Sequence, residues 1–156
     1  MNNYQRIGSQ NNATVGRIFE NKIYEYFLSK EKIDLKRQPS IKIGVSNFEK
    51  EHKEHKFDLI SREEKKEKII IECKCHKWRK KINVPSAKMT IWNEAMYYFL
   101  LLPKKYKKYF VIPKDYNEKR KMTLAQYYIS QYKHLIPKGV EIFEYDERNN
   151  NLEKVL

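Results

Sequence analysis

The segment KIIIECKCHKW, residues 68–78, constrains the fold of this chain more than any other segment. Its three consecutive isoleucines predict a buried β-strand, because β-branched residues favour strands. Side chains alternate along a strand, so Glu72 and Lys74 share one face. Cys73 and Cys75 share the other face, which we expect to point toward the core. Because buried charges need partners, the end of this strand is a solvated strand end, a metal site or a catalytic Glu-x-Lys.

The remaining periodicity predicts an α/β chain with the element order αβββαβαβ. Apolar residues at three- and four-residue steps predict a first helix from Ala13, with Thr14 as its N-cap. Alternating or short apolar runs predict strands, and a polar turn between 55–61 and 68–75 predicts a hairpin. The expected strands are 41–46, 55–61, 68–75, 108–114 and 140–146, and the later helices are 84–102 and 122–136. This order favours a mixed central β-sheet flanked by helices.

Length predicts one domain over 1–156, with a flexible arm at 1–12 and a frayed tail at 148–156. No apolar run approaches the roughly 20 residues of a membrane span. The N-terminus also lacks the apolar core of a signal peptide. We therefore expect a cytoplasmic protein without a membrane partner. The absence of a Gly-rich phosphate loop argues against an organic cofactor.

Charge is the strongest compositional signal. The chain has 33 Lys and Arg against 20 Asp and Glu, giving a net charge of +13 and a pI of about 9.6. Such an excess favours a polyanionic partner, because neutralising phosphates releases condensed counterions. The alternative is that lysines only solvate the surface.

A second carboxylate is expected near Glu72. Asp58 lies in the strand candidate 55–61, and folding the hairpin brings it beside Glu72. Two carboxylates and a backbone carbonyl form a hard oxygen site suited to Mg²⁺. A nearby lysine can stabilise charge developing on phosphorus. This combination is typical of metal-assisted phosphodiester hydrolysis.

These residues resemble the signature of the PD-(D/E)xK nuclease superfamily, which includes restriction endonucleases and archaeal Holliday junction resolvases. The match consists of Phe57-Asp58 and Ile71-Glu72-Cys73-Lys74, with thirteen residues between Asp58 and Glu72. A glutamate of the first helix, here Glu20 in the sequence GRIFEN, also matches many members. The chain departs from the pattern where Phe57 replaces the proline. The resemblance covers roughly Ala13 to Asp146 and implies a restriction endonuclease-like core.

The resemblance also implies roles for these residues. Asp58 and Glu72 would bind the metal together with the Cys73 carbonyl, and Lys74 would orient or activate water. Glu20 would be an outer ligand of the metal or its water, with Glu25 as a weaker substitute. The expected cofactor is Mg²⁺, for which Mn²⁺ can substitute.

A basic segment follows the strand directly. We expect it to contact the phosphate backbone of DNA, and Trp78 either stacks on a base or packs internally. Lys88 either faces the site or is an ordinary surface lysine. The candidate DNA-binding residues are Lys77, Trp78, Arg79, Lys80, Lys81 and Lys88.

A zinc site is the alternative for the cysteines. It would combine Cys73, Cys75 and His76 with His52 and His55. Against it, Cys-x-Cys lacks the usual gap of two to four residues, and there is no second cysteine pair.

The sequence therefore predicts a Mg²⁺-dependent DNA endonuclease. Little insertion beyond the core favours a structure-selective, Holliday junction resolvase-like enzyme that works as a homodimer, because cutting two strands needs two symmetric sites. A sequence-specific type II restriction endonuclease is the alternative substrate class. A nucleic-acid-binding module without catalysis is the alternative from another functional class.

Overall fold

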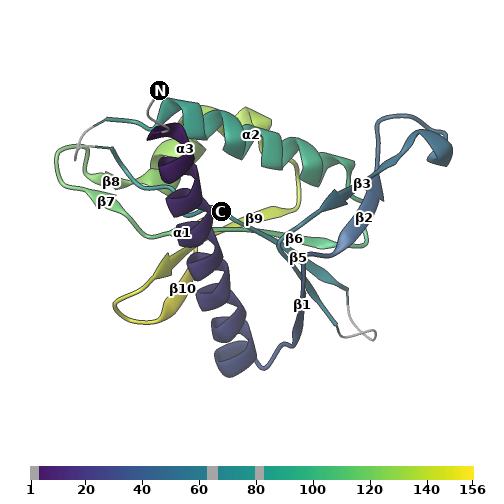
Figure 1. Cartoon of the computed structure of the whole chain (residues 1–156), viewed down its shortest axis with the longest axis horizontal. Coiled ribbons are helices and arrows are strands. Elements are labelled where there is room, and N and C mark those ends of the chain that lie inside the picture. Colours follow the sequence, from purple (N-terminus) through teal and green to yellow (C-terminus); the bar gives the residue numbers. More distant parts are fainter. Residues whose placement is uncertain (1–3, 63–66, 80–82) are drawn as a thin grey trace.

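The computed structural model describes residues 4–62, 67–79 and 83–156. It is an α/β structure built on a mixed six-stranded sheet (Figure 1). The strand order is β1-β4-β5-β6-β9-β10. The strands are β1 (Leu35–Arg37), β4 (Leu59–Ser61), β5 (Ile69–Cys73), β6 (Lys107–Pro113), β9 (Val140–Asp146) and β10 (Asn151–Lys154).

The three central strands of the sheet, β5, β6 and β9, run parallel. The outer pairs β1–β4, β4–β5 and β9–β10 are antiparallel. The antiparallel β4–β5 pair confirms the predicted hairpin. Parallel strands need crossover connections, and helices α2 and α3 lie in the two crossovers.

Helices pack on both faces of the sheet (Figure 1). Helix α1 (Tyr4–Tyr26), which continues into a π-helical turn (Phe27–Glu31), packs its buried Phe19 and Ile23 against one face. Helices α2 (Ser86–Leu101) and α3 (Leu124–Tyr132), the latter followed by a 3-10 turn (Lys133–Leu135), pack against the other. We call these two apolar layers the α1 layer and the α2–α3 layer. Neighbouring residues of β5 alternate between them: Ile70 lies in the α2–α3 layer, and Ile71 lies in the α1 layer.

Local sequence explains the helix ends. Thr123 caps α3 through a capping box, in which its side chain accepts from the Gln126 amide and the Gln126 side chain accepts in return from the Thr123 amide. Pro85 occupies the N-cap position of α2, where its missing N–H costs nothing. Both helices thus lie within the predicted ranges. None of the helices described here is long and apolar enough to cross a membrane.

Two small sheets stand beside the main one. Strands β2 (Ser40–Ile43) and β3 (Lys53–Lys56) pair with each other, with a 3-10 turn (Glu49–Glu51) in the loop between them. Figure 1 shows this hairpin extending away from the sheet. Strands β7 (Tyr116–Asn117) and β8 (Met122–Thr123) form a second hairpin before α3.

The structure corrects the predicted strand order. The three strands expected before α2 were 41–46, 55–61 and 68–75, but the first of these corresponds to β2, which pairs with β3 in a separate two-stranded sheet. The range 55–61 is interrupted at Phe57 and Asp58, where the chain passes from β3 to β4. The first strand of the main sheet is instead the short β1. Three residues carry too little periodicity to predict a strand.

Both chain ends also differ from the prediction. Helix α1 begins at Tyr4 rather than Ala13, so Thr14 lies within the helix and does not cap it. No proline interrupts the residues from Tyr4 to Thr14, and the helix simply continues through them. The expected frayed tail contains β10, which pairs with β9. Leu152 supplies the reason, because its side chain packs against the α1 layer.

Candidate active site

Asp58 lies at the break between β3 and β4. Phe57 is buried in the α2–α3 layer, where its ring stacks 6.0 Å from that of Phe99, and Leu59 is buried in the α1 layer. These two anchors hold Asp58 at the end of β5. Its Oδ2 accepts a hydrogen bond of 2.7 Å from the amide of Cys73.

Glu72 and Lys74 meet at the end of β5. Lys74 Nζ donates to Glu72 Oε1 at 2.6 Å, as expected for side chains on the same face. Glu72 is only 8% exposed. Its second oxygen, Oε2, is buried and has no well-formed hydrogen bond within the described residues, although the backbone amide of Asp58 lies near enough to the carboxylate to help lower the pKa of Glu72. A buried carboxylate oxygen without a donor is costly, so this atom marks a place where a ligand would be stabilising.

The Cys73 side chain is 6% exposed and packs in the α1 layer, as predicted for a core residue. The backbone amide of Cys73, by contrast, points within the sheet toward Asp58. The neighbouring amide of Lys74 donates to Val111 of β6, whereas the Cys73 amide donates toward Asp58. In extended backbone the N–H and C=O of one residue point to the same side of the strand. The Cys73 carbonyl therefore also points toward the Asp58 side.

Glu20 reaches this site from α1. The helix is held to β1 by Arg37, whose Nη1 donates to Asn21 Oδ1 at 2.6 Å and whose guanidinium lies 4.2 Å from the Tyr24 ring centre. Burial and the charge of Asp58 raise the pKa of Glu20. The influence of Asp58 on Glu20 means that the two carboxylates lie within electrostatic range of each other.

The carboxylates strongly perturb one another. Burial, followed by repulsion from Glu72, raises the pKa of Asp58 to about 7. Burial also raises the pKa of Glu72, and the charge of Lys74 offsets only part of this increase. For Lys74, burial alone would lower the pKa, but the charge and hydrogen bond of Glu72 outweigh it and raise the pKa. Without a bound cation, the pair Asp58 and Glu72 thus retains a proton near neutral pH.

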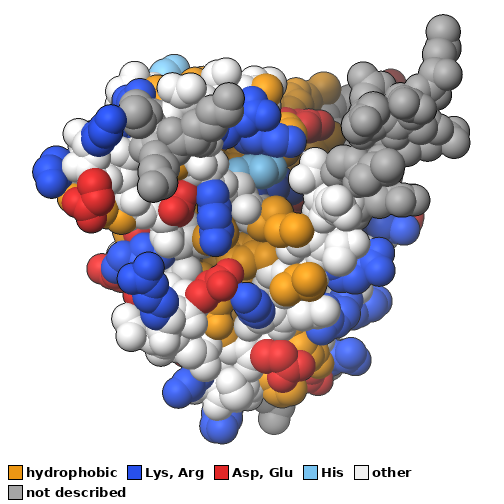
Figure 2. All heavy atoms as spheres, turned by 60° about the vertical axis from the view of Figure 1, so that its left-hand side comes forward, with side chains coloured by type: hydrophobic (Ala, Val, Ile, Leu, Met, Phe, Trp, Pro, Cys, Tyr) orange, Lys and Arg blue, Asp and Glu red, His pale blue; other side chains and the backbone are white. Residues whose placement is uncertain are grey.

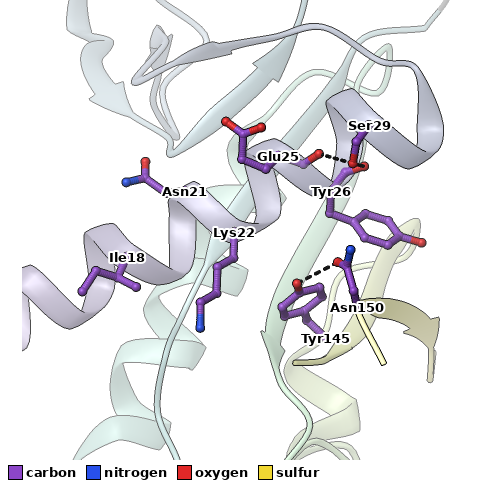
Figure 3. Close-up of a pocket in the computed structure, with 8 residues that line it drawn as sticks. All are labelled: Ile18, Asn21, Lys22, Glu25, Tyr26, Ser29, Tyr145 and Asn150. Atoms are coloured by element: carbon purple, nitrogen blue, oxygen red, sulfur yellow. Dashed lines mark hydrogen bonds between the residues drawn. The ribbon is translucent and has the colours of Figure 1, made fainter. Parts of the chain in front are cut away.

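Glu25, the substitute considered for Glu20, lies on a different side of α1 from Glu20. The two residues are five positions apart, which places them about 140° apart around the helix. Glu25 lines a separate pocket of about 370 Å³ between α1 and the β9–β10 hairpin, where Lys22 and Tyr145 also lie (Figure 3). Of the two glutamates, only Glu20 joins the carboxylate cluster.

The basic segment after β5 is partly tied to the protein. The Trp78 amide donates to Asp115 Oδ2 at 2.7 Å, and its indole Nε1 donates to the Asp115 carbonyl at 3.0 Å. The Trp78 ring packs against Tyr127, with 5.5 Å between the ring centres. These contacts favour the hypothesis that Trp78 packs inside the protein over the hypothesis that it stacks on a base.

The lysines and arginines of the candidate DNA-binding set are placed differently. Lys77 and Arg79 are exposed, and Arg79 forms an isolated β-bridge with Asn83. Lys80 and Lys81 lie outside the described residues. Lys88 is half-buried in the first turn of α2. On the face drawn in Figure 2, Lys and Arg side chains are interspersed with acidic and apolar ones.

The candidate zinc ligands are dispersed. His52 Nε2 lies 2.7 Å from the Ser46 carbonyl, and His55 stacks on Tyr98 with 3.7 Å between the ring centres. His76 accepts a hydrogen bond from Trp92. Within residues 4–62, 67–79 and 83–156, no group of three or more His, Cys, Asp or Glu is arranged to hold a metal ion, and this applies to the carboxylates as well.

The sequence offered His76 as a zinc ligand and as the first residue of the segment expected to contact DNA phosphates, but it did not predict the bond to Trp92. The signal that would have found this contact is weak, because it joins residues 16 positions apart on different elements. A scan of family models found no match, and no curated protein matches the chain. The geometry of the site therefore carries the functional argument.

Proposed function

We propose that this chain is a Mg²⁺-dependent DNA endonuclease of the PD-(D/E)xK type. The observation that carries the proposal is the convergence of Glu20, Asp58, Glu72 and Lys74 from three separate parts of the chain. Three carboxylates whose pKa values are raised by burial increase the free energy of the folded protein when they are ionised, and Lys74 offsets only part of this cost. Such perturbed groups gather at functional sites.

The donor set fits a magnesium ion. Mg²⁺ prefers carboxylate and carbonyl oxygens and keeps several waters, so one or two carboxylates suffice. Asp58 and Glu72 would hold it with the Cys73 carbonyl, and Glu20 would bind one of its waters. The orphaned Glu72 Oε2 and the raised pKa of Asp58 support this assignment. When bound, the cation supplies charge that neutralises the phosphate under attack; Mn²⁺ would substitute.

Lys74 is the residue that would act on the reacting groups. Its ammonium lies 2.6 Å from Glu72 Oε1, so it is held beside the metal-binding oxygens. From there it would position the attacking water and stabilise negative charge on the phosphate. Phe57, which replaces the family's proline, would serve the same site by anchoring the strand before Asp58 in the α2–α3 layer.

The substrate that we propose is branched DNA cut by a homodimer. Among the described residues, the additions beside the main sheet are the short β2–β3 and β7–β8 hairpins, and neither is large enough to form a separate recognition domain. A type II restriction endonuclease remains the competing substrate class. A binding module without catalysis would have no use for a carboxylate cluster that destabilises the fold.

Cleavage of defined DNA tests the function. A four-way junction, a plain duplex and a single strand are each incubated with Mg²⁺, with Mn²⁺ or with chelator. Symmetric nicks in the junction support the resolvase reading, whereas discrete duplex fragments support restriction. Asp58→Asn and Lys74→Ala should each reduce the cleavage rate by at least about 100-fold.

The matched control is Glu25→Gln, because Glu25 lies on the same helix as Glu20 but outside the cluster. Glu25→Gln should cleave at the wild-type rate, and Glu20→Gln should be slower by about tenfold. If Asp58→Asn retains full metal-dependent activity, the proposed site is wrong.

A further inference from the structure

His76 is held in one protonation state by a buried tryptophan. Trp92, which is fully buried on α2, donates its indole N–H to His76 Nδ1 at 2.8 Å. An indole nitrogen can only donate, so Nδ1 must be unprotonated to accept this bond. The proton of the neutral ring therefore sits on Nε2, and His76 presents a fixed N–H donor there.

Two cations keep the ring neutral. Burial, with the nearby charges of Lys88 and Lys74, lowers the pKa of His76 to about 4. Lys88 precedes Trp92 by four residues, so both lie on the same face of α2, one turn apart. Lys88 is half-buried there and is close enough for its charge to lower the pKa of His76. Within the described part of the chain, His76 Nε2 makes no hydrogen bond.

We propose that His76 Nε2–H and Lys88 form an anion subsite that binds a phosphate of the polynucleotide backbone next to the one being cleaved. Both groups donate and neither accepts, which suits a phosphate oxygen. His76 would be a binding residue and not an acid or base, because Nδ1 is occupied and Nε2 already carries its proton. The identity of the anion as a polynucleotide rests on the proposed function, whereas binding of phosphate itself does not.

Binding is measured without cleavage, on the full chain in the presence of chelator. The protein is labelled with ¹⁵N-histidine, and its imidazole resonances are followed as inorganic phosphate, and then a short DNA duplex, is added. The His76 Nε2 resonance should shift saturably with both ligands. The resonance of the exposed His134 serves as the internal control and should not shift.

Variants test the contribution of each donor. Lys88→Gln should weaken duplex binding about tenfold at low salt and lower the salt slope by about one, because one phosphate contact is lost. Lys138→Gln, at an exposed position beyond α3, is the matched control and should bind like the wild type. His76→Phe should also lose about tenfold, whereas His76→Gln, which keeps an N–H donor, should lose less. If His76→Phe does not fold, DNA binding by Lys88→Gln and the shift of the His76 Nε2 resonance still test whether the subsite exists.

Two different sets of results would refute the anion subsite and the nuclease activity. If the wild type cleaves DNA but His76 does not respond and Lys88→Gln binds normally, the subsite is refuted and the nuclease proposal stands. If His76 responds and Lys88→Gln binds weakly while no DNA is cleaved with Mg²⁺, the subsite stands and the nuclease proposal is refuted.

Discussion

Replacing Asp58 with asparagine should stabilise the metal-free protein while abolishing cleavage. The side chain is held in a mostly buried site beside Glu72, and both factors raise its pKa from 3.8 to about 7. The folded protein therefore binds this proton more tightly than the unfolded chain does. The resulting stability is fully present below pH 3.8 and is lost as the pH rises through about 7.

The size of the effect follows from the shift. A change of about three pKa units corresponds to about 4 kcal/mol of lost stability once the pH exceeds 7. About 1 kcal/mol of this is already lost at pH 4.5, because the unfolded carboxyl is then mostly ionised. Asparagine has no charge to lose and keeps an oxygen that can accept from the Cys73 amide. The stability gained by Asp58→Asn should therefore be about 3 kcal/mol larger at pH 8 than at pH 4.5.

Urea unfolding with chelator at both pH values measures this difference. Asp34→Asn is the matched control, because Asp34 is an exposed aspartate that pairs with Arg62 on the surface. Surface pairs contribute between about 0 and 1 kcal/mol, so this control should change little between the two pH values. Equal effects of Asp58→Asn at pH 4.5 and pH 8, or a loss of stability at pH 8, would refute the electrostatic account of the site.

Three further outcomes follow from the same contacts. Lys74→Met should destabilise the protein by about 2 kcal/mol at pH 8 and by less at pH 5, because Glu72 loses its partner while ionised. An equal loss of unfolding free energy in urea at both pH values would contradict this. Mg²⁺ affinity should rise with pH and level off above about 7, as the proton shared with Asp58 is displaced; calorimetry in buffers of different ionisation enthalpy should show proton release at pH 6 and little at pH 8.5. Asp115→Ala should cost about 1–2 kcal/mol and increase hydrogen exchange at the Trp78 amide, which loses its acceptor; unchanged exchange there would show that Asp115 does not hold this segment.

The sequence predicted most of the site because strand periodicity is local. The isoleucines and the alternation of β5 predict a buried strand whose end carries Glu72 and Lys74 on one face. The same alternation predicts that Cys73 packs inward, which the structure confirms. The turn between β4 and β5 then brings Asp58 close.

Only the tertiary structure decided which helical glutamate belongs to the cluster. The sequence favoured Glu20 and kept Glu25 as a weaker substitute. In the structure Arg37 ties α1 to β1 through Asn21, and Glu20 lies within electrostatic range of Asp58. The orientation of a helix around its own axis depends on contacts with distant residues, so periodicity alone cannot assign it.

Strand order and the chain ends depended on tertiary structure for the same reason. β1 is three residues long and β10 follows a polar turn, so neither has a local pattern strong enough to predict pairing. The sequence by itself determined the central strands, the later helices and the placement of Glu72 and Lys74 on one face at the end of β5, because those features lie within single elements. The structure decided the edges of the sheet, the rotation of α1 and the His76–Trp92 contact, because each of these depends on residues far apart in the chain.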